Sequence, residues 1–390
     1  MDHSVRVLEE AVLPSTSMIT AKDIQSRSIA VGDLDMHILE AFPEGVEHAP
    51  LLVLLHGFPE LAYSWRKVIG PLADAGYHVV APDQRGYGRT VSRDSPARRV
   101  DYGDDLSPFR ITNLVKDVLG LVFALGYRST AGVVGHDYGS PVAAYCALIR
   151  PDVFQSVVLM SAPFAGPPAL SPSPTSSDFS ALAGPLAELN PPRKHYMLYF
   201  STDRANKDLI YPPEGLRSFL RNYFYVKSAD WTENAPESLS GPLVPALASL
   251  PDYYVMPLHA SMPEAVRPYQ PSEDDLSWFP EDDLDFYVQE FSRTGFQGGL
   301  NSYRVMTSRD WQADLELFAG MQIVVPAMFL AGKEDWGTYQ RPGGVEAMRE
   351  SACAHFDALV LVEGAGHWVQ QEQSERVVEE IVRFVQKHSK

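Results

Sequence analysis

The chain contains 390 residues, of which 45% are hydrophobic and 21% are charged, a composition expected of a folded protein with a large core. Its formal net charge of −18 argues against nucleic acid and anionic membranes as partners, because both are bound through basic patches. The two cysteines, Cys146 and Cys353, are too few for a disulfide framework and are not spaced as zinc ligands. We therefore expect a reducing compartment and no bound metal.

The first segment, about residues 1–25, is a polar leader without the basic and apolar blocks of a signal peptide. No apolar run of the chain reaches the length needed to span a membrane. From these features we expect a cytoplasmic protein without a membrane partner.

The predicted secondary structure begins with a hairpin, formed by residues 28–31 and 36–39 on either side of a Gly-Asp turn. Residues 51–55 are a continuous apolar run, typical of a strand buried on both faces of a parallel sheet. Helices and strands then alternate: a helix at about 63–75, a strand at 78–81, a helix at 111–125, a strand at 130–134, a helix at 140–149 and a strand at 157–160. This alternation predicts a mostly parallel α/β sheet with right-handed crossovers.

The alternation stops between about residues 164 and 311, where the pattern shows helical patches but no series of strands. Residues 165–192 are rich in Pro and Ser and are expected to run irregularly over the surface. The alternating pattern then resumes with strands at 323–330 and 358–362 and a closing helix at 374–386. We therefore predict one sheet domain in two parts, 1–162 and 313–390, interrupted by a mainly helical cap at 163–312.

A glycine-flanked turn at residues 135–139, with the sequence Gly-His-Asp-Tyr-Gly, joins a predicted strand to a predicted helix. This pattern is typical of a nucleophile elbow, in which glycines let the chain turn sharply and expose the central side chain. Asp137 occupies the position where a serine would be usual. The alternative is an ordinary turn aspartate near the start of a helix.

The carboxylate of Asp137 limits the chemistry that such an elbow can perform. A carboxylate that attacks an sp3 carbon forms an ester, which activated water can hydrolyse, whereas a serine would form a stable ether. The elbow therefore predicts substitution at the carbon of an epoxide or alkyl halide, and it disfavours an esterase or lactonase.

Two further residues complete a predicted triad. Asp335 and His367 each follow the end of a predicted strand, as Asp137 does, and open α/β sheets place their sites at this edge. The alternatives are that Asp335 is a solvated loop residue, with Glu334 as a competitor for its role, and that His367 only packs in the fold.

The chain resembles the epoxide hydrolases of the α/β-hydrolase fold, which are related to the microsomal and soluble enzymes and to haloalkane dehalogenases. The resemblance rests on His-Gly-Phe-Pro-Glu at residues 56–60, the elbow, Gly-Lys-Glu-Asp at residues 332–335 and the Gly-His pair at residues 366–367. It implies a mostly parallel sheet flanked by helices, an inserted helical cap and no cofactor or metal.

The resemblance also implies roles for residues outside the triad. Tyr303, and Tyr196 or its neighbour Tyr199, would bind and protonate the epoxide oxygen, while the backbone amides of Phe58 and Tyr138 would form an oxyanion hole. Relatives usually carry an aromatic residue directly before the tyrosine that Tyr303 matches, and this chain has Ser302 there. Four other residues are expected to contact the substrate: His56, Pro59, Trp336 and Trp368.

The predicted activity is hydrolysis of a small-molecule epoxide to a vicinal diol through an aspartyl ester, with water as the second reactant and a homodimer as one possible assembly. A role in detoxification or secondary metabolism is an expectation from family analogy alone. Two alternatives stay open: a haloalkane or fluoroacetate dehalogenase with the same triad, which would bind halide through cap donors such as Trp231, Trp278 or Trp311, and a non-enzymatic ligand receptor on this fold.

Overall fold

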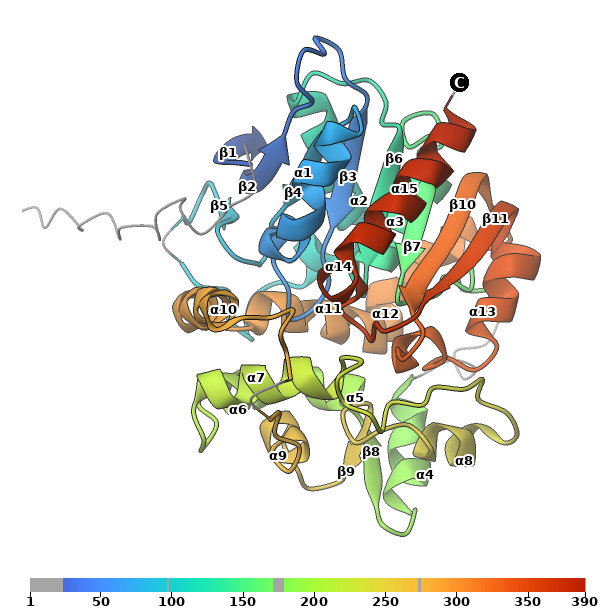
Figure 1. The fold of residues 1–390 in the computed structure, drawn as a ribbon. Coiled ribbons are helices and arrows are strands. Elements are labelled where there is room, and N and C mark those ends of the chain that lie inside the picture. The colour runs from blue at the N-terminus through green and yellow to red at the C-terminus, as the bar shows by residue number, and fades with distance from the viewer. Residues whose placement is uncertain (1–23, 97, 171–178, 273–274, 390) are drawn as a thin grey trace, which may run out of the picture.

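The computed structural model describes residues 24–96, 98–170, 179–272 and 275–389. It consists of a large sheet with helices on both faces and a second, mainly helical layer packed below one edge of the sheet (Figure 1). The predicted N-terminal leader lies almost entirely outside the described residues, as does the middle of the Pro- and Ser-rich segment at 165–192.

A nine-stranded sheet forms the centre of the molecule, in the order β1-β2-β4-β3-β6-β7-β10-β11, with β5 paired to β2. Pairing is antiparallel where β2 meets β1, β4 and β5, and parallel from β4 to β11, which confirms the predicted mostly parallel α/β sheet. The strands are β1 (Gln25–Val31), β2 (Leu34–Ala41), β3 (Leu51–Leu55), β4 (His78–Pro82), β5 (Val91–Ser92), β6 (Gly132–His136), β7 (Val157–Met160), β10 (Ile323–Gly332) and β11 (Cys353–Val362).

Helices cover both faces of this sheet. Helices α1 (Arg66–Asp74) and α15 (Ser374–His388) lie on one face, and α2 (Ile111–Ala124) and α3 (Gly139–Ile149) lie on the other (Figure 1). Successive side chains of strand β3 alternate between the two hydrophobic cores, because Leu52 and Leu54 pack with α1 and α15 while Val53 packs with α2 and α3. The continuous apolar run of β3 thus has the two-sided burial that the sequence predicts.

The segment between β7 and β10 is mainly helical but also contains a two-stranded antiparallel sheet, β8 (Arg193–His195) and β9 (Val255–Pro257). The sequence shows no strands here, because strands of three residues are too short to leave an alternating pattern. The helices are α4 (Ala183–Ala187), α5 (Tyr196–Phe200), α6 (Ala205–Ile210), α7 (Leu216–Val226), α8 (Leu243–Ala248), α9 (Met262–Val266), α10 (Glu281–Thr294), α11 (Gln297–Thr307) and α12 (Arg309–Gln312).

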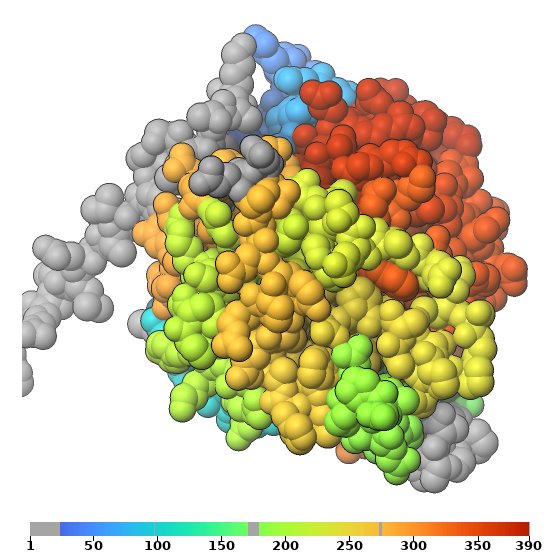
Figure 2. Space-filling view, turned by 60° about the horizontal axis from the view of Figure 1, so that its bottom comes forward, coloured from blue at the N-terminus to red at the C-terminus, as the bar shows by residue number. Residues whose placement is uncertain are grey.

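This segment covers the edge of the sheet at which the parallel strands end. Helices α10 and α11 lie next to the sheet, and α5 to α9 with β8 and β9 form the layer below them (Figure 1). Seen from that side, residues coloured yellow-green to orange cover most of the surface (Figure 2). Phe58, which follows β3, packs against Phe200 and Tyr303 from the helical segment, so one aromatic cluster joins the two layers.

Two short helices, α13 (Gly344–Ala347) and α14 (Val369–Glu372), follow β10 and β11. Strand β11 begins five residues before its predicted start, because this edge strand is half-exposed and its first residues lack an apolar pattern. Within the described residues, no helix is both long and apolar enough to cross a bilayer.

Candidate active site

A sharp turn between β6 and α3 places Asp137 at the edge of the sheet. Asp137 has a φ of +51°, a left-handed conformation that is uncommon for a residue with a side chain. The flanking glycines are sterically required, because a Cβ on Gly135 would lie 2.0 Å from the carbonyl oxygen of Gly139, and one on Gly139 would lie 2.3 Å from the carbonyl oxygen of Leu55. The close approach of α3 to β6 and β3 therefore fixes the turn that presents the Asp137 carboxylate.

The two oxygens of the Asp137 carboxylate have different surroundings. Oδ1 accepts a hydrogen bond of 2.9 Å from the backbone N–H of Phe58, whereas Oδ2 lies 3.4 Å from Nε2 of His367. Burial acts to raise the pKa of Asp137, but His367 and then the ammonium of Lys227 outweigh it, so the pKa lies well below its usual range. The carboxylate is therefore ionised at neutral pH.

His367 connects Asp137 to Asp335. Its Nδ1 lies 3.1 Å from Oδ1 of Asp335, and the same oxygen accepts a hydrogen bond of 2.7 Å from the backbone N–H of Gly337. Asp335, and not its neighbour Glu334, thus contacts the imidazole. Burial acts to raise the pKa of Asp335, yet the charge and hydrogen bond of His367 hold it below its usual value. An ionised Asp335 orients the ring so that Nε2 faces Asp137.

Two tyrosines of the helical segment lie close together above this triad. The rings of Tyr196, at the start of α5, and Tyr303, on α11, are 5.8 Å apart, and the ring of Phe58 lies 5.3 Å from that of Tyr303. The Tyr196 hydroxyl donates to Oε1 of Gln340 at 3.1 Å, while the Tyr303 hydroxyl makes no hydrogen bond within the described part of the chain. Burial and then the charge of Asp137 raise the pKa of both phenols well above the usual value, so both are protonated.

Close backbone packing brings α11, and with it Tyr303, to the sheet. A Cβ on Gly298 would lie 1.8 Å from the carbonyl oxygen of Gly86, and one on Gly299 would lie 2.7 Å from both the Phe58 ring and the Tyr87 hydroxyl. The Gly-Gly pair at the start of α11 therefore lets the helix touch the loop after β4. Any side chain at Gly298 would push the helix and Tyr303 away from the triad.

The alternative second tyrosine, Tyr199, has a different environment. Its hydroxyl donates to Oδ2 of Asp208 at 3.0 Å, and its ring lies under Nζ of Lys194 at 4.9 Å. The structure thus brings Tyr196, and not Tyr199, next to Tyr303.

Comparison with known proteins shows the family of this chain. A family model described as the alpha/beta hydrolase fold matches residues 50–373. The chain is 35% identical over 358 residues to epoxide hydrolase B of Mycobacterium tuberculosis, covering 87% of this chain and 92% of that protein. It is also 33% identical to epoxide hydrolase A of the same species, covering 92% of this chain and 96% of that protein. This chain belongs to the epoxide hydrolase family.

Solved structures of epoxide hydrolases share its fold. An epoxide hydrolase from an endophytic Streptomyces superposes with a TM-score of 0.74 at 30% identity, covering 94% of this chain and 96% of that chain. Epoxide hydrolase A from Mycobacterium thermoresistibile gives a TM-score of 0.71 at 33% identity, covering 93% and 98%. The α/β-hydrolase fold predicted from the sequence is therefore confirmed.

The four other residues predicted to contact the substrate have different environments in this epoxide hydrolase. His56 is fully buried, with Nδ1 near the carbonyl oxygen of Gly57 and Nε2 accepting the N–H of Gln84, which leaves neither nitrogen free for a substrate. The indole N–H of Trp368 donates to the carbonyl oxygen of Phe224. The indole N–H of Trp336 is buried and has no partner among the described residues, and Pro59 follows Phe58 through a cis peptide bond.

The two backbone amides predicted to form the oxyanion hole, those of Phe58 and Tyr138, have different surroundings. The Phe58 amide already holds Oδ1 of Asp137. Tyr138 is the N-cap of α3, where backbone N–H groups have no partner inside the helix, and its amide directly follows the nucleophile. Among the described residues, no three His, Cys, Asp or Glu side chains are grouped as metal ligands.

A buried network below the triad was not assigned from the sequence. Oε2 of Glu60 lies 2.5 Å from Nδ1 of His136 and accepts the N–H of Gly57, while Nε2 of His136 lies 2.7 Å from the carbonyl oxygen of His367. Gln370 donates to the other oxygen of Glu60. The network fixes the Phe58, Asp137 and His367 loops relative to one another. Glu60 and His136 both lie inside motifs quoted above, which is the one signal that could have identified them.

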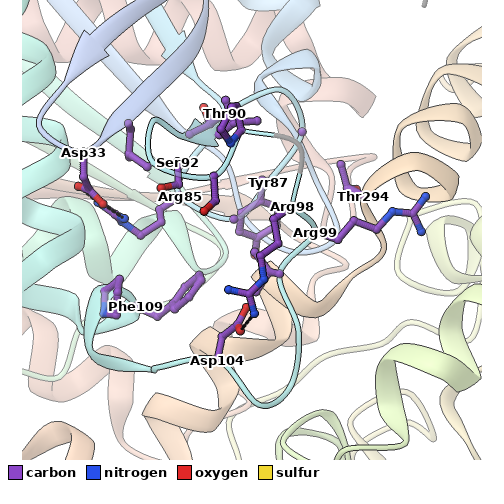
Figure 3. A pocket seen from close by; sticks show the side chains of 18 of the residues that line it. Asp33, Arg85, Tyr87, Thr90, Ser92, Arg98, Arg99, Asp104, Phe109 and Thr294 are labelled. Carbon is purple, nitrogen blue, oxygen red and sulfur yellow. Dashed lines mark hydrogen bonds and ion pairs between the residues drawn. The ribbon is translucent and has the colours of Figure 1, made fainter. Parts of the chain in front are cut away.

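A separate pocket of about 540 Å³ is lined by Tyr87 and its neighbours, and no residue of the triad lines it (Figure 3). Its cations are mostly paired, since Arg85 bonds Asp33 and Asp117, and Arg98 bonds Asp104 (Figure 3). The ring of Tyr87 also contacts that of His56 at a ring-centre distance of 4.7 Å.

Proposed function

We propose that this protein hydrolyses small-molecule epoxides to vicinal diols through an ester on Asp137. One observation carries the proposal: the Phe58 amide holds Oδ1 of Asp137, and Oδ2 faces Nε2 of His367 beneath two protonated phenols. Membership of the epoxide hydrolase family supports the same activity.

In the first step, Oδ2 of Asp137 attacks an oxirane carbon, and the bond from that carbon to the epoxide oxygen breaks. An alkoxide is a poor leaving group, so Tyr196 and Tyr303 would hydrogen-bond the oxygen and one of them would give it a proton. Because Oδ1 stays on the Phe58 amide, it becomes the carbonyl oxygen of the ester.

In the second step, Nε2 of His367 takes a proton from water, and the resulting hydroxide attacks Cγ of Asp137. The negative charge that develops on Oδ1 would be stabilised by the amides of Phe58 and Tyr138, and Asp335 would stabilise the imidazolium. When the tetrahedral intermediate collapses, the bond from Cγ to the diol oxygen breaks and the imidazolium returns its proton to that oxygen. The new Asp137 carboxyl then loses its proton to solvent, and the tyrosinate left by the first step takes a proton back, so both groups regain their starting state.

The two phenols favour epoxides over the dehalogenase alternative. Halide leaves without protonation and is bound by N–H donors. Of the tryptophans expected as such donors, Trp278 already donates its indole N–H to Asp230, Trp311 packs under Arg110, and Trp231 packs against Tyr253 and Tyr269. A screen for diol formation from structurally varied epoxides tests the proposal. Chloride release from haloalkanes without any diol from epoxides would contradict it, as would tight ligand binding with no turnover of either class.

The division of the chain belongs to this proposal as well. Residues 163–312 act as the cap that brings Tyr196 and Tyr303 over the triad, and 1–162 and 313–390 form the core. The acidic composition and the two free buried cysteines support a cytoplasmic location, which subcellular fractionation tests. Sedimentation analysis tests whether the chain forms a homodimer.

A further inference from the structure

Lys227 is a buried lysine near the triad whose ammonium is hydrogen-bonded to no anion among the described residues. It follows the last residue of α7 and is 3% exposed. Its ammonium makes no hydrogen bond or ion pair within the residues that the structure describes. An ammonium carries three N–H donors, and removing it from water without acceptors is costly. Such a group gains most from a ligand that brings an anion to it.

Three aromatic rings surround this ammonium. Nζ lies 5.1 Å from the ring centre of Tyr254, 5.3 Å from that of Tyr223 and 5.5 Å from that of Trp368. Cation–π contacts of this kind offset part of the cost of burial, but the rings accept no strong hydrogen bond from the N–H groups. The aromatic cage therefore holds the charge in place without neutralising it.

The backbone on both sides of Lys227 is fixed. Nδ2 of Asn234 donates to the carbonyl oxygens of Val226 and Ser228 at 3.0 and 2.8 Å, and the Tyr253 hydroxyl donates to Oδ1 of Asn234 at 2.7 Å. The carbonyl oxygen of Lys227 itself accepts the backbone N–H of His367 at 2.7 Å. Lys227 is thus attached directly to the loop of the proposed base, and its position is set before any ligand binds.

The ammonium also lies near the reacting groups. The Tyr254 ring, which contacts Nζ, is 5.2 Å from the ring of Tyr196, and the charge of Lys227 is one cause of the lowered pKa of Asp137. Without this cation, the carboxylates of Asp137 and Asp335 would repel an anionic substrate. Burial lowers the pKa of Lys227, while the charges of Asp137 and Asp335 act to raise it. When it is protonated, Lys227 brings a positive charge to this site.

We propose that Lys227 binds a carboxylate on the substrate, so that epoxides bearing an acidic group near the oxirane ring are preferred. This inference rests on the proposed epoxide hydrolysis. The ammonium donates hydrogen bonds to the carboxylate, and the aromatic rings around it take the apolar part of the molecule between the acid and the epoxide.

Two rigid substrates test this subsite: 4-(oxiran-2-yl)benzoate and its neutral counterpart, 4-(oxiran-2-yl)benzamide. The measured quantity is the ratio of kcat/KM for the acid to kcat/KM for the amide. We expect the wild type to prefer the acid and Lys227→Met to lower the ratio by roughly 10- to 100-fold, the range of a hydrogen bond to a charged group. Lys227→Arg should retain most of the preference, since it keeps the charge.

Lys194→Met is the matched control, because Lys194 is another lysine of the helical segment that lies over a tyrosine ring. It should keep the wild-type ratio. If Lys227→Met keeps the wild-type ratio, even when kcat/KM falls equally on both substrates, the proposal is overturned. Lys227 would then act on Asp137 or on the fold alone.

Calorimetry with two unreactive ligands, 4-ethylbenzoate and 4-ethylbenzamide, separates this inference from the proposed activity. Tighter binding of the benzoate that is lost in Lys227→Met supports the subsite even if the wild type forms no diol, a result that would contradict only the epoxide hydrolysis. Diol formation by the wild type with no preference for either acid would overturn only the subsite. Should Lys227→Met not fold, the same measurements on Lys227→Gln decide between these outcomes.

Discussion

The triad and the two proposed cap tyrosines face the same space, but different interactions hold them there. Asp137, Asp335 and His367 sit on turns directly after strands and are fixed by backbone hydrogen bonds and by glycine contacts with the sheet. Tyr196 and Tyr303 reach the site through side-chain packing across a layer boundary, among rings of Phe58 and Phe200. The sheet therefore fixes the proposed nucleophile and base, whereas packing of the proposed cap sets the positions of the proposed leaving-group donors.

The largest effect should come from the nucleophile on the sheet side. Asp137→Ala should reduce diol formation by about 10⁴-fold or more, because no neighbouring group can form the ester. Circular dichroism should show an intact fold. Asp152→Ala, which removes an exposed aspartate paired with Arg150, is the control and should keep full activity. Substantial epoxide opening by Asp137→Ala would show that Asp137 is not the nucleophile.

His367 should divide the reaction into its two steps. In His367→Gln, alkylation still proceeds but ester hydrolysis stalls, because only the second step needs a base. Intact-mass measurement after mixing with substrate should show one adduct per chain, located on Asp137 by peptide mapping. An inactive protein without an adduct would mean that His367 acts earlier or only supports the fold.

Removing the tyrosine hydroxyls of the proposed cap should slow alkylation, the first step, and leave ester hydrolysis unchanged. Tyr303→Phe should slow alkylation by roughly 10- to 1000-fold, and the double variant with Tyr196→Phe should slow it further, while ester hydrolysis stays close to the wild-type rate. Pre-steady-state kinetics measures the two steps separately. Tyr199→Phe is the matched control, because that hydroxyl bonds Asp208, and it should alkylate normally. Unchanged epoxide opening without both proposed donors would favour a dehalogenase.

The smallest effect should come from the contact between the two layers. Gly298→Ala forces a Cβ against the carbonyl oxygen of Gly86 and should destabilise the fold by about 1–3 kcal/mol. The same change at Gly184, a helical glycine of α4 with open space around it, should not destabilise it. Chemical unfolding compares the two variants. Equal stability of both would mean that α11 is not held by this approach.

The same comparison explains how much the sequence could predict. The sheet, the elbow and the positions of Asp335 and His367 follow strand ends, so periodicity and short motifs predict them. Strand pair β8–β9 and the orientation of Tyr196 against Tyr199 depend on packing between distant segments, which leaves no local pattern. Lys227 lies in no motif, and its position depends on Asn234 and on the His367 loop.

The most direct test of the account is a single turnover in H₂¹⁸O with enzyme in excess over epoxide. If water attacks Cγ of an Asp137 ester, the diol keeps its unlabelled oxygens and the peptide that contains Asp137 gains ¹⁸O, because the oxygen of the nucleophile leaves with the product. Mass spectrometry of the diol and of the peptide measures both. A labelled diol with an unlabelled Asp137 would show that water opens the epoxide directly and would contradict the ester.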